Sequence, residues 1–109
     1  MKIDNDFAPT TITDWVTLCG TLAQAKGFNL TAIDQQLLLI VSEVVEAHDV
    51  YRNRTGLAGH YEEAISEELA DIVIRVFSFC FGNGIDLEAA IIRKNATNEG
   101  RPYKHGKDF

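Results

Sequence analysis

The sequence predicts an all-α fold, namely a four-helix bundle with a basic C-terminal tail that assembles as a dimer or a dimer of dimers. Apolar residues recur at steps of three and four in four segments, whereas no segment shows the sustained alternation that a half-buried strand requires. Short glycine-containing joints separate the segments, which favours antiparallel neighbours. With 109 residues, the chain is predicted to form a single domain, residues 1–109, around one core.

The first two predicted helices fill the N-terminal half of the chain. The first lies in "TITDWVTLCGTLAQAKG", with a threonine at its start as N-cap and Lys26-Gly27 as a stop signal. The second begins after Asn29 or Thr31 and runs to about Arg54, where "TGLAG" interrupts it. Because this second helix is apolar on most sides, we expect another subunit to cover part of its surface.

The last two predicted helices are separated by "GNG". The third runs from about Tyr61 to Cys80 or Phe81, where the glycines stop it. Asp86 is the expected N-cap of the fourth, "DLEAAIIRKNATN", which ends before Gly100. The tail "GRPYKHGKDF" is predicted to be irregular, since it is polar and rich in glycine.

Composition excludes several classes of protein. Sixteen acids against ten lysines and arginines give a net charge of −6, which makes sequence-independent nucleic-acid binding a poor candidate. The longest aliphatic run, "LLLIV", is far shorter than a membrane span, and no secretory signal is recognisable, so a cytoplasmic location is expected. Cys19 and Cys80 are predicted to be reduced core thiols, since each is flanked by apolar residues.

Two pairs of acids stand within apolar helices. Glu43 and Glu46 are three residues apart, as are Glu68 and Asp71, so each pair shares one helix face. If the second and third helices pack antiparallel, the four carboxylates can meet, and their repulsion then requires a cation. An all-oxygen ligand set suits Mg²⁺, which also leaves positions for phosphate oxygens. The alternative for either pair alone is a solvated helix face.

The motifs "SEVVEA", "EELADIVIRV" and "RKNATNEGRPYKHGK" together resemble the MazG-like branch of the all-α nucleoside triphosphate pyrophosphohydrolases. The resemblance covers about residues 31–107 and rests on "ExxE", a later "ExxD" and a downstream Lys and Asn before a basic tail. It implies a helical bundle, assembled as a dimer or a dimer of dimers, with sites near subunit interfaces. Many relatives have a further acid where this chain has Ser42, which leaves the number of metal ions open.

The resemblance also implies roles for individual residues. Glu43, Glu46, Glu68 and Asp71 would bind Mg²⁺ and form the catalytic centre. The residues implied to contact the phosphates and the sugar of a nucleoside triphosphate are Lys94, Asn98, Arg101, Lys104, His105 and Lys107. For the base, which needs an apolar or aromatic slot, the first segment offers Trp15 and Phe7, although both residue types are more often part of a core.

The leading hypothesis is Mg²⁺-dependent hydrolysis of nucleoside triphosphates to the monophosphate and pyrophosphate, with a role in nucleotide-pool house-cleaning. Segregated charge supports it, since eight acids lie between Glu43 and Asp71 and five basic residues between Arg93 and Lys107. One alternative is a sensor that binds nucleotide or metal without turnover. Another is a structural dimerisation module whose acids pair with Arg52, Arg54 or Arg75.

Overall fold

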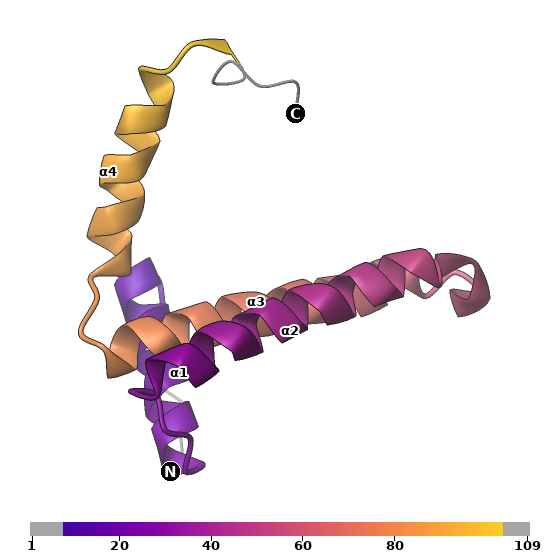
Figure 1. Cartoon of the computed structure of the whole chain (residues 1–109), viewed down its shortest axis with the longest axis horizontal. Helices are drawn as coiled ribbons and strands as arrows, with labels where there is room; N and C mark the ends of the chain where they lie inside the picture. The colour runs from indigo at the N-terminus through magenta and orange to yellow at the C-terminus, as the bar shows by residue number, and fades with distance from the viewer. Residues whose placement is uncertain (1–7, 104–109) are drawn as a thin grey trace.

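The computed structural model describes residues 8–103. These residues form helices joined by irregular segments, with no strand among them. This confirms the predicted all-α class. Figure 1 shows the four helices in chain order. They are α1 (Ile12–Ala25), α2 (Ile33–Arg52), α3 (Tyr61–Gly82) and α4 (Leu87–Glu99), with a short 3₁₀ helix, η1 (Arg54–Leu57), between α2 and α3.

Local hydrogen bonds explain where the helices begin and end. Thr11 caps α1 through a capping box, in which its side chain accepts from the backbone N–H of Asp14 and the Asp14 carboxylate accepts from the N–H of Thr11. Asp86 caps α4, as predicted, by accepting from the N–H of Ala89. At the end of α2, the Asn53 side chain donates to the Asp49 carbonyl at 2.9 Å, so this helix stops two residues before its predicted end.

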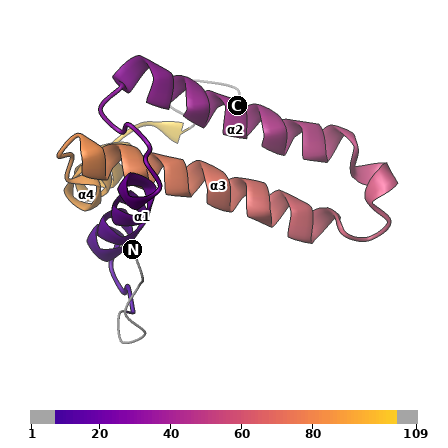
Figure 2. The ribbon, with the colours of Figure 1, turned by 90° about the horizontal axis from the view of Figure 1, so that it is seen from below.

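The centre of the fold is α3, which packs against both α1 and α2. Figures 1 and 2 show α2 and α3 as an antiparallel hairpin, with α1 crossing it near the C-terminal end of α3. The approach between α1 and α3 is close at Gly20, where an added Cβ would collide with the ring of Phe81. Glycine is therefore needed at this crossing, because any larger residue would push α1 off α3.

The fourth helix departs from the predicted bundle. It contacts the start of α1, where the backbone N–H of Ile12 donates to the Glu88 carboxylate at 3.1 Å, and then projects away from the α2–α3 hairpin (Figure 1). The radius of gyration is 16.6 Å, against about 13 Å for a compact chain of this length. Within one chain, the four-helix bundle is therefore not confirmed.

The core of this open arrangement is small. Its buried apolar residues are Val16, Cys19, Leu30, Ala47 and Cys80, and no described side chain is completely buried. Both cysteines are free thiols, as predicted, and burial raises the pKa of each.

By contrast, one side of α2 exposes a continuous apolar stripe, formed by Leu38 (68% exposed), Val41 (56%) and Val45 (53%). Among the helices within residues 8–103, none is long and apolar enough to cross a membrane.

Candidate metal centre

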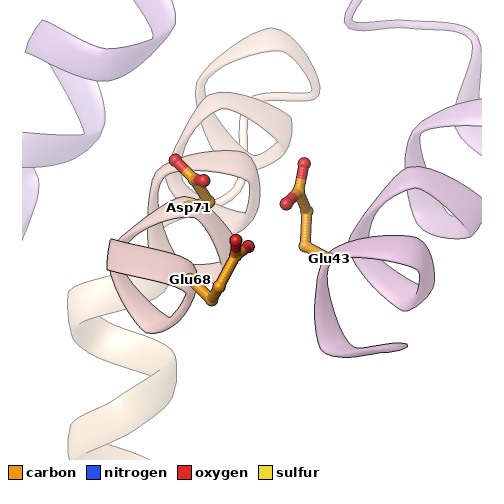
Figure 3. A group of neighbouring side chains, drawn as sticks. All are labelled: Glu43, Glu68 and Asp71. Carbon is orange, nitrogen blue, oxygen red and sulfur yellow. The ribbon is translucent and has the colours of Figure 1, made fainter. Parts of the chain in front are cut away.

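Three of the four predicted acids come together between α2 and α3. Glu68 and Asp71 lie one turn apart on α3, and the antiparallel hairpin sets Glu43 of α2 opposite them (Figure 3). One carboxylate oxygen from each residue lies within 4.8 Å of the other two. On α2, Glu43 shares the buried face with Gln36 and Ala47, since these positions are seven and four residues away from it.

Two carboxylate oxygens in this cluster are buried without a hydrogen-bond partner. Glu43 is only 9% exposed, yet its Oε2 has no donor, and the same is true of Oε2 of Glu68. A buried carboxylate oxygen that receives no donor is costly, because it has given up its hydrogen bonds to water. Both oxygens therefore have free capacity for a cation, and oxygen-only ligation of this kind suits Mg²⁺. The donor set fits the ion that the sequence analysis predicts.

A salt bridge satisfies the other oxygen of Glu43. Nε of Arg75, one turn after Asp71 on α3, donates to Oε1 of Glu43 at 2.9 Å. The hypothesis of a structural dimerisation module predicted that Arg75 pairs with one of the acids. This one arginine does not neutralise the cluster, however. Three carboxylates and one guanidinium leave a charge of about −2, which one divalent cation would balance.

The fourth predicted acid, Glu46, lies beside the cluster rather than in it. Its side chain is exposed, and it is not among the three residues whose oxygens lie within 4.8 Å. The hydrogen bond that protonated Glu46 would donate to Glu43, and repulsion from the charge of Glu43, raise the pKa of Glu46, with smaller contributions from burial and from the charges of Glu68 and Asp71. Glu46 therefore feels the negative field of the other three acids.

Replacing Glu46 with glutamine is expected to change how the stability of the metal-free protein depends on pH. Because the folded pKa lies above the ordinary value of 4.5, the folded chain holds this proton more tightly than the unfolded chain. The resulting stabilisation is complete below that ordinary value and is lost as the pH rises through the raised pKa. The free energy of unfolding can be measured with urea in EDTA from about pH 4 to about pH 8. As the pH rises, the stability of Glu46→Gln should increase relative to that of the native protein. A difference between the two proteins that does not vary with pH would contradict this account.

One cavity adjoins the acids, and a second cavity lies next to the first. The first, about 320 Å³, has Glu43, Asp71 and Arg75 in its wall together with Phe28 and Gln36. The second, about 300 Å³, is mainly apolar and lies between α1 and α3. They share part of their walls, so an apolar space opens beside the carboxylates. The shared residues are Ala23, Phe28, Ile74 and Ser78.

Trp15 lines the second cavity and is 45% exposed, so it has a face available to a ligand. Sequence reasoning missed Phe28 and Gln36, which line the first cavity. Gln36 is buried and its Nε2 donates to the Asn29 carbonyl at 3.0 Å. A signal for it was present, because Gln36 is a polar residue seven positions before Glu43, on the same face of an apolar helix.

Within residues 8–103, the predicted phosphate-contacting residues do not join the acids. Lys94 and Asn98 are exposed on α4, and Lys94 lines a separate cavity with Ala90, Arg93 and Thr97. Arg101 follows the end of this helix and is exposed. Since α4 projects away from the α2–α3 hairpin (Figure 1), the residues that it carries lie apart from the acids of the same chain. The remaining predicted residues, Phe7, Lys104, His105 and Lys107, lie outside the described residues.

Comparison of the chain with protein-family models, with curated proteins and with solved structures finds no match.

Proposed function

We propose that this protein is a Mg²⁺-dependent pyrophosphohydrolase that converts nucleoside triphosphates to the monophosphate and pyrophosphate. One observation carries the proposal. Three carboxylates from two helices converge, and two of their buried oxygens lack any hydrogen-bond partner. This is the environment that a hard cation satisfies, and polyphosphates are the substrates that such cations commonly hold. House-cleaning of the nucleotide pool is the biological role that we propose for this reaction.

The reaction cleaves the bond between the α-phosphorus and the oxygen that bridges it to the β-phosphate. Water adds to the α-phosphorus, pyrophosphate leaves with the bridging oxygen, and the proton lost by water passes to a carboxylate or to solvent. When bound, Mg²⁺ supplies the positive charge that acidifies water and neutralises phosphate oxygens. Glu43, Glu68 and Asp71 would hold it, with Glu46 beside them.

The second cavity suits the nucleobase. Its apolar walls include Trp15 and Phe28, which offer aromatic faces for stacking, and it adjoins the cavity that contains Glu43 and Asp71. A nucleotide whose base enters the apolar space can therefore bring its phosphates toward the acids.

A second copy of the chain is proposed to complete the site. The apolar stripe of Leu38, Val41 and Val45 lies on the side of α2 opposite Glu43, and an exposed apolar surface of this kind is typical of an interface. Ile92 on α4 is also 66% exposed. Because α4 projects away from the acids of its own chain, association would allow it to bring Lys94 to the acids of a partner.

The test is product analysis with a panel of ribo- and deoxyribonucleoside triphosphates, with Mg²⁺ or with EDTA. We expect equal amounts of pyrophosphate and nucleoside monophosphate, formed only when Mg²⁺ is present. Release of inorganic phosphate and a diphosphate instead would show cleavage at a different bond. Mg²⁺-dependent binding of nucleotide with no product from any triphosphate would reject the enzyme and favour the sensor.

A further inference from the structure

The ion pair between Arg75 and Glu43 has a consequence for the cation site of the proposed function, on which this inference rests. An arginine that binds a metal ligand withdraws electron density from the carboxylate and repels a cation that approaches it. We infer that Arg75 is an internal counter-ion, which competes with the divalent cation for Glu43 and lowers the affinity of the metal-free site. Arg75 is therefore a positioning residue, since it acts on the ion through Glu43.

The geometry supports competition for one carboxylate. Arg75 Nε donates to Oε1 of Glu43 at 2.9 Å, while Oε2 of the same carboxylate is buried and has no partner, in a side chain that is 12% exposed. A cation that uses Oε2 alone shares the carboxylate with a guanidinium, whereas a cation that uses both oxygens must displace Arg75. In either arrangement, the two positive groups lie close together and oppose each other.

A cavity next to Arg75 can accept its side chain when a cation displaces it from Glu43. Its guanidinium carbon lies 6.0 Å from the centre of the Phe28 ring, and both residues line the 320 Å³ cavity beside the acids. Its side chain is 29% exposed, so a turn into this cavity does not require the core to open. There its N–H groups would be available to an anionic ligand, which a guanidinium binds well. Cation and anion would then assist each other through the same arginine.

The measurement is Mn²⁺ binding, followed by the electron paramagnetic resonance signal of free Mn²⁺, which is an oxygen-preferring stand-in for Mg²⁺. The main variant is Arg75→Gln, because glutamine removes the charge and still offers an N–H to Glu43. We expect roughly tenfold tighter binding of Mn²⁺ than by the native protein, together with a lower melting temperature in EDTA. Arg75→Lys keeps the charge and should stay close to native affinity.

Arg52→Gln is the matched control. It removes the same charge from an exposed position on α2, nine residues and about 14 Å along the helix from Glu43. We expect little change in Mn²⁺ affinity, because charges at this separation are largely screened. An equal effect of Arg52→Gln and Arg75→Gln would overturn the inference, since net charge rather than the ion pair would then set the affinity.

The other outcomes separate this inference from the proposed function. If the native chain binds Mn²⁺ and Arg75→Gln binds it no more tightly, Arg75 does not compete and the inference fails, while the hydrolase proposal stands. If the variant binds more tightly but no triphosphate is cleaved, the inference holds and the enzyme proposal fails. If neither protein binds Mn²⁺ at millimolar concentration, the acids are not a cation site and the inference is rejected.

Discussion

Replacing Glu43 with glutamine is expected to lower pyrophosphate release at least about a thousandfold while leaving the protein folded. Glu43 is the buried member of the acid cluster and the one that contributes an unpartnered oxygen from α2, so it links the two helices that would hold the cation. Glutamine has the same shape, and its carbonyl oxygen can still accept from Arg75. The loss should therefore reflect a missing charge rather than a collapsed helix pair.

The control for this change is Glu67→Gln, which removes one negative charge from an exposed position next to Glu68 on α3. Its rate should stay near that of the native protein, because Glu67 does not belong to the three-residue cluster. Circular dichroism and melting in EDTA would establish that both variants are folded. Native rates in folded Glu43→Gln would reject the carboxylate cluster as the catalytic centre. A similar loss in both variants would mean that the reaction responds to overall charge.

The helices could be predicted because their signals are local. Thr11, Asp86 and the glycines between segments act on neighbouring backbone groups, and the three-residue spacing of Glu68 and Asp71 determines that they share a face. The antiparallel packing of the second and third helices was predicted from their short joint and is confirmed. The shared face of Glu68 and Asp71 and the antiparallel packing of α2 and α3 together explain why Glu43 lies close to the two acids of α3.

The remaining parts depend on tertiary structure, which spacing does not encode. Glu46 lies three residues from Glu43, yet it is exposed, because the turn of α2 that buries Glu43 carries Glu46 toward the edge of the hairpin. Helical periodicity likewise predicted α4 but not its direction, since that depends on contacts at its first turn, such as the bond between Ile12 and Glu88. A sequence pattern shows which residues share a helix face, but not which surface that face meets.

Mixing two inactive variants, Glu43→Gln and Lys94→Gln, is expected to restore activity if the catalytic site is shared between copies. Lys94 lies on α4, which projects away from the α2–α3 hairpin of its own chain (Figure 1). Each variant alone should be at least about a hundredfold slower than the native protein, because one loses a cation ligand and the other a charge that stabilises the departing pyrophosphate.

In a symmetric dimer, each hybrid contains one site with both defects and one site with neither. Random re-association makes about half of the dimers hybrid, so about a quarter of the native activity should return. If Lys94 instead served the acids of its own chain, every site in a hybrid would carry one defect and no activity would return. The amount recovered therefore reports which chain supplies the lysine.

The matched control mixes Glu43→Gln with Asp71→Asn, two variants that both damage the acid cluster. These acids come from one chain, so hybrids contain no intact site and activity should stay low.

Light scattering should give a native mass of two or four times the 12.1 kDa of one chain. Leu38→Asp, on the apolar stripe of α2, should lower both that mass and the recovered activity. Hybrids that form but recover no activity would exclude a shared site. If recovery of activity requires the apolar stripe, a site built by two chains explains both features of the single chain. The exposed face of α2 would form the interface, and the projecting α4 would reach the acids of the partner.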